Sequence, residues 1–216
     1  MNQLSSGLFV LALLLSALLG YGQPGPTPAS AIRVLQDIQY LTGPGSDPRF
    51  HSLDLYLPEG RSNVPLMFFV HGGGWRGGER SQEGRVRFMD LLLSRGMAVA
   101  SIDYRVSPAV KHPAHIQDVA QAFAWIHENA PRYGIDADNI FVTGQSAGGH
   151  LVSLLALDPR YLKAKGLSPT NIKAVISLSG VYDLDNFWEP GLEPKRRSRR
   201  LASIERFCGK LHRCRK

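Results

Sequence analysis

The sequence predicts an α/β fold in which helices cover both faces of a mostly parallel sheet. Short apolar runs alternate along the chain with longer segments in which apolar residues recur at helical spacing. From residue 65 to residue 178 the order of these segments is strand, helix, strand, helix, strand, helix, strand. This succession brings the strands together in parallel and packs the connecting helices against the sheet. With 216 residues, 44% of them hydrophobic, the chain is expected to form one such domain.

Six segments are predicted to be strands because their apolar residues alternate or cluster. The runs at 65–70 and 97–102 are almost continuously apolar, which is typical of strands buried on both faces. The regular pattern ends near Phe187, so we expect a sheet that is incomplete after the sixth strand. That strand is then an edge with uncovered apolar side chains. The predicted strands are residues 32–40, 52–57, 65–70, 97–102, 140–143 and 172–178.

Three segments are predicted to be helices. Residues 86–94 and 116–129 carry apolar side chains at helical spacing, and residues 147–157 are rich in small and apolar residues. A loop through Pro131 and Gly134 separates the second helix from the next strand. The apolar face of the second helix consists of Ile116, Val119, Ala120, Phe123 and Ile126.

Residues 1–22 are predicted to be a cleaved signal peptide, which implies export to the periplasm or the medium. Residues 7–19 are almost wholly apolar, and Gly20 and Gly22 are small residues of the kind that signal peptidase reads. The run is shorter than the roughly 20 residues that cross a bilayer, so no stable membrane span is expected. No Lys or Arg precedes it, which leaves a short anchor or a buried N-terminal helix as the alternative. The Pro- and Gly-rich residues 23–31 are predicted to be a linker.

Residues 189–216 differ in composition from the rest of the chain. They hold ten Lys and Arg against three Glu, whereas the other 188 residues hold fifteen basic and fifteen acidic residues. Both cysteines, Cys208 and Cys214, also lie there, so the body of the chain has no disulfide and no thiol ligand for a metal. We expect residues 32–188 to form a partial domain and residues 189–216 a disordered basic tail. The basic run at 195–200 does not fit beside an export signal, so no nucleic-acid partner is expected.

Gly144, Ser146 and Gly148 form a G-x-S-x-G motif between a predicted strand and a predicted helix. A turn this sharp strains the serine backbone and brings neighbouring backbone very close, where glycine has no Cβ to clash. It lifts the serine hydroxyl above the sheet and directs a helix N-terminus toward it. This placement predicts that Ser146 is a nucleophile and disfavours a Gly/Ser-rich turn without chemistry.

The segment His71-Gly72-Gly73-Gly74-Trp75 directly follows a predicted buried strand. Its glycines let backbone N–H groups crowd around one point. The N–H groups of Gly72, Gly73 and Ala147 are therefore predicted to stabilise an oxyanion. A phosphate-binding loop is disfavoured, because no Gly-Lys-Ser/Thr follows and no helix begins there. His71 itself is expected to be a structural residue of this loop rather than a catalytic base.

With these motifs the chain resembles the carboxylesterases of the α/β-hydrolase superfamily. The most similar branch is the acetyl-xylan/feruloyl esterase-like group, related to the hormone-sensitive-lipase family. The resemblance implies an α/β-hydrolase fold, Ser146 as nucleophile, an oxyanion hole of Gly72, Gly73 and Ala147, and no metal or organic cofactor. It also implies that residues 103–105 support the glycine loop and the top of the sheet. It covers about residues 52–187 and rests on His71-Gly72-Gly73-Gly74-Trp75, Asp103-Tyr104-Arg105, Tyr133-Gly134-Ile135-Asp136 and Gly144-Gln145-Ser146-Ala147-Gly148-Gly149-His150-Leu151.

Members of this family also have an acid and then a histidine after the serine. His150 lies one helical turn after Ser146 and belongs to the elbow motif, so its side chain is expected to stay within that helix. His212 lies in the basic tail. Asp183 and Asp185 follow a strand, but the resemblance places them in a structural turn. We therefore expect a premature end followed by an unrelated tail, and at most marginal esterase activity from this chain.

The leading hypothesis is an exported serine hydrolase that forms an acyl-enzyme on Ser146. Its expected substrates are carboxylic esters, either short-acyl esters or acetyl and feruloyl groups linked to a polysaccharide. Two alternatives stay open: a formamidase-type amide hydrolase, which shares the tetrahedral chemistry, and a non-catalytic secreted binding protein on a hydrolase scaffold. The expected partner is a small ester or an acylated polysaccharide. The sequence pattern carries no information on oligomeric state.

Overall fold

The computed structural model describes residues 31–81 and 86–182. The predicted signal peptide at 1–22, all of the predicted linker except Ala31, and the predicted tail at 189–216 lie outside the described residues. So do residues 183–188 at the end of the predicted domain.

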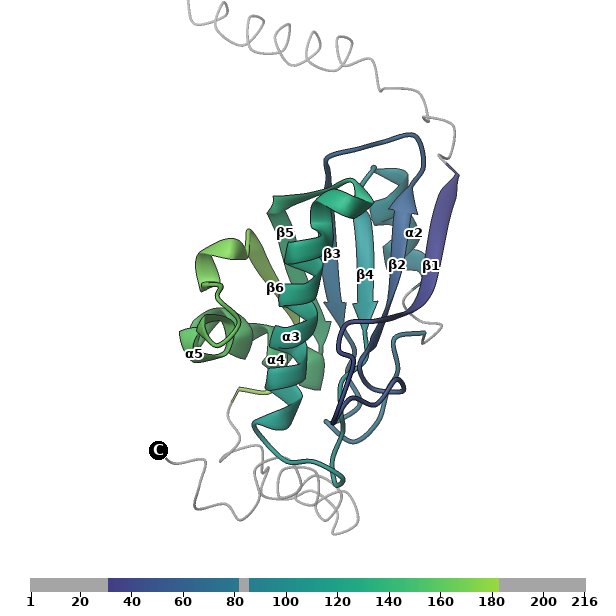
Figure 1. Cartoon of the computed structure of the whole chain (residues 1–216). Coiled ribbons are helices and arrows are strands. Elements are labelled where there is room, and N and C mark those ends of the chain that lie inside the picture. The colour runs from purple at the N-terminus through teal and green to yellow at the C-terminus, as the bar shows by residue number, and fades with distance from the viewer. Residues whose placement is uncertain (1–30, 82–85, 183–216) are drawn as a thin grey trace, which may run out of the picture. The chain divides into compact units, whose positions relative to one another are not determined.

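Six strands form one mixed sheet in the order β1-β2-β4-β3-β5-β6 (Figure 1). The β1–β2 and β2–β4 pairs are antiparallel, whereas β4–β3, β3–β5 and β5–β6 are parallel. The prediction of a mostly parallel sheet is therefore confirmed, with an antiparallel extension on one side. The strands are β1 (Ile32–Gln39), β2 (Ser52–Pro58), β3 (Val64–Val70), β4 (Ala98–Ile102), β5 (Ile135–Gln145) and β6 (Ala174–Leu178).

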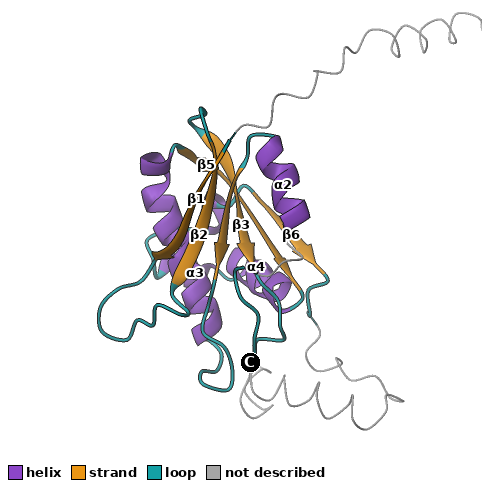
Figure 2. Cartoon of the chain, turned by 90° about the vertical axis from the view of Figure 1, so that its right-hand side faces the viewer, coloured by secondary structure: helices purple, strands orange, loops and turns teal. Residues whose placement is uncertain are grey.

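Helices lie on both faces of the sheet, as predicted: α3 (Ala114–Asn129) and α4 (Ala147–Leu157) on one face and α2 (Val86–Ser94) on the other (Figure 2). The side chains of β3 show the two faces by their alternation. Leu66, Phe68 and Val70 belong to the larger core, where Phe68 meets Phe123 of α3 edge-on at 5.6 Å between ring centroids. The smaller core, on the α2 side, consists of Met67, Phe69, Met89, Leu93 and Val99.

Three parts of the structure differ from the predicted elements. Before the last strand, an unpredicted 3-10 helix (Pro169–Asn171) is present and β6 begins at Ala174 rather than at residue 172. β5 begins at Ile135 rather than at residue 140. It follows a 3-10 helix (Ala130–Tyr133) whose C-cap is Gly134. The polar residues between 136 and 139 break the apolar pattern, although the backbone already pairs with β3 at Ile135 and Val64. The short helix α5 (Pro159–Lys163) was not predicted, because five residues are too few to show a helical period. Asp158 caps it by accepting the Arg160 backbone N–H.

Within residues 31–81 and 86–182, no helix is long and apolar enough to cross a membrane. Over the same residues, His, Cys, Asp and Glu side chains form no group of three or more that could hold a metal ion.

Candidate active site

Ser146 occupies the sharp turn between β5 and α4, where the sequence predicts it. Its backbone has φ 53° and ψ −115°, a left-handed conformation that is strained for any residue but glycine. Its N–H donates to the Leu178 carbonyl at 2.8 Å, and its carbonyl accepts the His150 N–H at 3.0 Å. The turn is thus fixed on one side by β6 and on the other by the first turn of α4.

The glycines around Ser146 are required by close backbone contacts. A Cβ at Gly144 would lie 2.5 Å from the carbonyl carbon and oxygen of Gly148. A Cβ at Gly148 would overlap the carbonyl oxygens of Val70 and His71 at the end of β3. Backbone atoms cannot move aside as a side chain can, so the predicted steric role of both glycines is confirmed.

The glycine loop, which we define as residues 71–80 after β3, brings Gly72 into contact with the turn that carries Ser146. A Cβ on Gly72 would stand 2.8 Å from the Gln145 carbonyl oxygen and 3.5 Å from Ser146 Cβ. Ala147 is the first residue of α4, so its backbone N–H has no partner within the helix. Gly73, with φ 103°, packs tightly against the Gly77 carbonyl as the loop doubles back. The structure therefore brings together Gly72, Ser146 and Ala147, with Gly73 next to them along the loop.

His71 is buried under the loop, and its contacts point away from a role as base. Its Nδ1 lies 2.7 Å from the Gly72 carbonyl oxygen, to which it donates, and its Nε2 lies 3.7 Å from Asp103 Oδ1. The ring stacks on Tyr104 at 4.3 Å, and the Tyr104 hydroxyl donates to the His71 carbonyl at 3.1 Å. Burial raises the pKa of Tyr104 well above its ordinary value, so this hydroxyl stays a donor. Asp103 and Tyr104 thus support the loop as predicted.

The Arg105 side chain turns the other way. It holds Asp118 of α3 through two bonds, Nε to Oδ2 at 2.8 Å and Nη2 to Oδ1 at 2.7 Å. Of the predicted supporting segment, Arg105 therefore ties β4 to α3, and the contacts with the glycine loop come from Asp103 and Tyr104.

The histidine nearest to the nucleophile in the sequence does not pair with it. Rather than staying within its own helix, the His150 ring meets Trp75 of the glycine loop edge-on at 5.4 Å. Burial lowers the pKa of His150 to about 4, so the ring is neutral near pH 7. No side chain among the described residues is hydrogen-bonded to the Ser146 hydroxyl. Asp183, Asp185 and His212 lie outside the described residues.

No sequence motif points to Arg80, which nevertheless lies at the end of the glycine loop in a cluster of carboxylates. Its Nε donates to Asp54 Oδ1 at 2.8 Å, and its Nη1 and Nη2 donate to Asp103 and Asp37. The only signal in the sequence is Asp54 itself, a charged residue within the apolar pattern of β2. We call Arg80, Asp37, Asp54 and Asp103 the Arg80 cluster.

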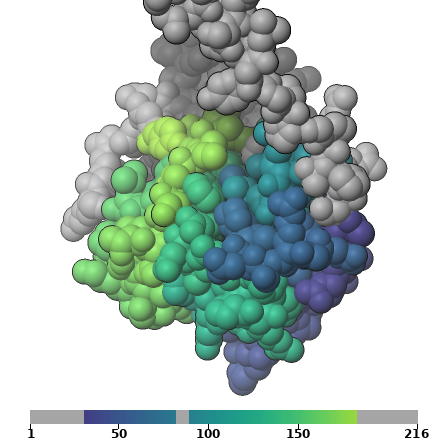
Figure 3. Space-filling view, turned by 90° about the horizontal axis from the view of Figure 1, so that it is seen from above, coloured from purple at the N-terminus to yellow at the C-terminus, as the bar shows by residue number. Residues whose placement is uncertain are grey.

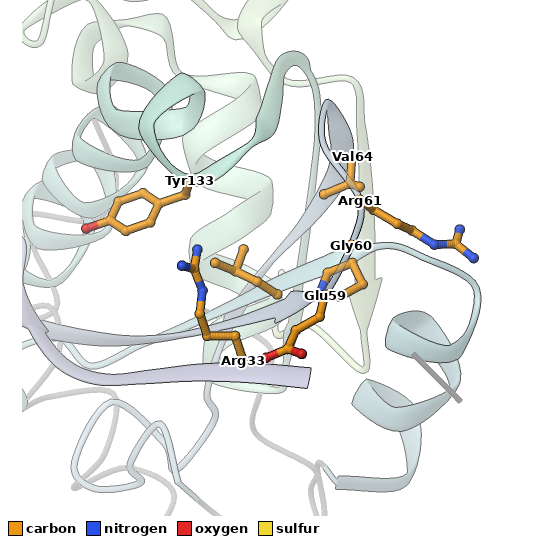
Figure 4. A pocket seen from close by; sticks show the side chains of 8 residues that line it. Arg33, Glu59, Gly60, Arg61, Val64 and Tyr133 are labelled. Atoms are coloured by element: carbon orange, nitrogen blue, oxygen red, sulfur yellow. The ribbon is translucent and has the colours of Figure 1, made fainter. Parts of the chain in front are cut away.

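A pocket of about 380 Å³ lies at the opposite end of the parallel strands. Arg33, Glu59 and Tyr133 line it near Val64, the first residue of β3 (Figure 4). Figure 3 looks onto this end, where residues near 60 lie beside residues near 133. Because Ser146 follows the last residue of β5, and β5 is parallel to β3, this pocket is not part of the candidate active site.

The family model BD-FAE matches residues 53–206, well over half of the chain. The chain belongs to the BD-FAE family. Esterase LipQ of Mycobacterium tuberculosis is 39% identical over 171 residues, which is 76% of this chain and 39% of the relative. Its fold and relatives place this BD-FAE chain among the carboxylesterases of the α/β-hydrolase superfamily, as predicted.

Solved structures agree with this family. Esterase B from Lactobacillus rhamnosis has a TM-score of 0.69 at 25% identity, over 96% of this chain and 65% of that one. A truncated form of a carbohydrate esterase from gut microbiota has a TM-score of 0.62 at 27% identity, over 74% of this chain and 61% of that one. Matches to the first two curated relatives span 33% and 39% of those proteins.

Proposed function

We propose that this BD-FAE protein is a serine hydrolase of carboxylic esters, with Ser146 as nucleophile. The observation that carries the proposal is the strained backbone of Ser146 at a strand-to-helix turn, in contact with Gly72 of the glycine loop. A serine is held in this conformation only where the surrounding structure enforces it, and such strain gathers at functional sites.

In the proposed reaction Ser146 Oγ attacks the acyl carbonyl carbon and its proton leaves to a base. The carbonyl oxygen becomes an oxyanion, which the N–H groups of Gly72, Gly73 and Ala147 stabilise. The bond to the alcohol oxygen then breaks, that oxygen takes up the proton from the base and departs as the alcohol, and the acyl group stays on Ser146. Water then hydrolyses this acyl-enzyme, which releases the acid and restores the serine hydroxyl. Loss of one oxyanion donor typically costs about 10²–10³ in rate.

The proposal assigns no base, because none of the described side chains is hydrogen-bonded to Ser146. Asp183, Asp185 and His212 lie outside the described residues, and slow turnover stays a prediction of the sequence pattern. In a serine hydrolase without its triad, the oxyanion hole and substrate binding still give about 10³–10⁴-fold acceleration over water.

We propose short-acyl esters or acetyl and feruloyl groups on polysaccharide as substrates. The relatives named esterases favour esters over the amides of a formamidase, and the carbohydrate esterase favours a sugar-linked group. Export through residues 1–22 remains part of this proposal, since a polysaccharide substrate lies outside the cell.

Labelling with a fluorophosphonate tests the proposal. We expect mass spectrometry to find the label on Ser146 and to find none on the S146A variant. The control is S153A, which removes another serine of α4 whose hydroxyl donates to the Gly149 carbonyl at 3.0 Å. An unlabelled wild-type chain would support the non-catalytic binding protein instead. Equal labelling of S146A would mean that another residue reacts and would contradict Ser146 as the nucleophile.

A further inference from the structure

The glycine loop is closed at its base by one carboxylate. The Asp103 Oδ1 atom accepts the Arg80 backbone N–H at 2.7 Å and lies 3.7 Å from Nε2 of His71. The Arg80 guanidinium binds the second oxygen of the same carboxylate. Residues 71 and 80, the two ends of the loop, therefore meet at Asp103.

Arg80 also ties this base to the antiparallel side of the sheet. Its guanidinium binds Asp54 of β2 and Asp37 of β1, and its carbonyl accepts the Ser101 hydroxyl of β4 at 2.8 Å. The Arg80 side chain is 15% exposed, and those of Asp54 and Asp103 are only 3% and 7% exposed, whereas that of Asp37 is 79% exposed. The buried bonds of Arg80 are therefore those to Asp54 and Asp103. Charge-assisted hydrogen bonds that are shielded from water in this way hold geometry more firmly than neutral ones.

Close packing carries this constraint from Arg80 to Gly72. A Cβ at Gly78 would overlap the His71 ring and lie 2.6 Å from the Gly72 carbonyl oxygen. Gly73 meets Gly77 in the same way, so the returning half of the loop lies directly against the half that faces Ser146. A displacement of the backbone at residue 80 is therefore expected to displace the backbone of Gly72 as well.

We propose that Arg80 is a positioning residue for the oxyanion site. It acts through Asp103 and His71 and holds the backbone of Gly72 and Gly73 at the distance from Ser146 that a tetrahedral intermediate needs. The inference rests on the proposed function, because a loop without an oxyanion to bind needs no such accuracy. A displacement of about 1 Å in a reacting group can cost about 10²-fold in rate.

The Arg105–Asp118 pair provides a matched control. It too is an Arg–Asp pair with two side-chain hydrogen bonds; the Asp118 side chain is 4% exposed, and the Arg105 side chain is half-buried at 31%. It joins β4 to α3 and makes no contact with the glycine loop in the hydrogen bonds described. Loss of Arg105 should destabilise the fold without moving Gly72.

The experiment compares R80M, R80K and R105M in the full chain. We expect R80M to lower kcat for a short p-nitrophenyl ester, and the rate of fluorophosphonate labelling, by about 10-fold or more with little change in KM. R80K, which restores one charged donor, should recover part of the loss, and R105M should change either rate by less than about 3-fold. Equal losses in R80M and R105M would reduce Arg80 to a structural residue.

Hydrogen exchange separates this inference from the proposed function. We expect the peptide that spans residues 71–80 to exchange faster in R80M than in wild type or R105M. Unchanged exchange in R80M would overturn the positioning role whether or not the chain is labelled. Faster exchange in R80M, combined with a wild-type chain that takes no label, would overturn the proposed function and leave the loop closure standing.

Discussion

β3 and β6 are both predicted from similar apolar runs, yet the structure places them in different environments. β3 lies between β4 and β5, and Leu66, Phe68 and Val70 are fully buried. β6 pairs with β5 alone among the described strands. Val175, Ile176 and Leu178 of β6 remain 38–42% exposed.

This difference shows what an apolar run does and does not specify. It sets a preference for extended backbone and for burial, but the burial depends on neighbours from elsewhere in the chain. β3 obtains a strand on each side and a helix layer on each face. β6 obtains one strand and contact with α4, so the prediction of an uncovered edge is confirmed for the described residues.

The largest expected contrast is in stability. F68A removes a side chain that is 0% exposed on β3, and we expect a loss of about 3–5 kcal/mol in the free energy of unfolding. I176A removes a side chain that is 42% exposed on β6, and we expect about 1 kcal/mol or less. Urea unfolding measures both. Similar losses would mean that β6 is covered in solution by another part of the chain or a second copy.

We expect acid to lower the stability of the fold through His115 of α3, one of the helices that pack on the same face of the sheet as Phe68 of β3. Burial lowers the pKa of His115 on α3 from an ordinary 6.5 to about 4, with a further contribution from His112. Between about pH 4 and pH 6.5, His115 is therefore protonated in the unfolded chain and neutral in the folded chain. Stability is full above about pH 6.5 and is lost as the pH falls toward 4.

At pH 4.5 we expect this one histidine to cost roughly 2–3 kcal/mol relative to pH 7, since each pKa unit corresponds to about 1.4 kcal/mol. H115Q removes the titration and leaves a polar group near Ser107, whose hydroxyl lies 3.1 Å from His115 Nε2. Urea unfolding at both pH values should show a smaller loss for H115Q. An identical loss in the two proteins would assign the acid sensitivity to other groups.

Two neighbouring glycines of α4 give the smallest and most local contrast. The atom nearest to a Cβ at Gly148 would be the Val70 carbonyl oxygen of β3, at 2.2 Å. The atom nearest to a Cβ at Gly149 would be the Ser177 hydroxyl oxygen of β6, at 2.7 Å. We expect G148A to cost about 1–3 kcal/mol, because backbone cannot yield. G149A should cost less, since the Ser177 side chain can rotate and the nearest backbone atoms are farther from the added Cβ, at 3.0 Å for the Gly144 carbonyl oxygen and 3.1 Å for Gly180 Cα. Thermal unfolding and Ser146 labelling measure the pair, and a greater loss in G149A would contradict this account.

The elbow at Ser146 is predictable from the sequence because its determinants are local. Gly144 and Gly148 lie two residues from the serine, and the strand and helix that they join have clear apolar patterns. The orientation of His150 toward Trp75 is not predictable in this way, since the two residues meet only after α4 has packed over the glycine loop. The start of β5 is missed for a similar reason, because its polar residues form a strand only through pairing with β3.

By itself the sequence determined the type and order of the six strands and of helices α2, α3 and α4, the position of Ser146 and the glycine loop, and the resemblance to its family. Only the tertiary structure decided the strand order, the orientation of His150 toward Trp75 and the gathering of three carboxylates around Arg80. The preference for strand or helix arises from interactions within a few residues. The contacts of Arg80 with the three carboxylates join residues 23 to 43 positions apart, and no local pattern specifies which of many charged residues will meet across that separation.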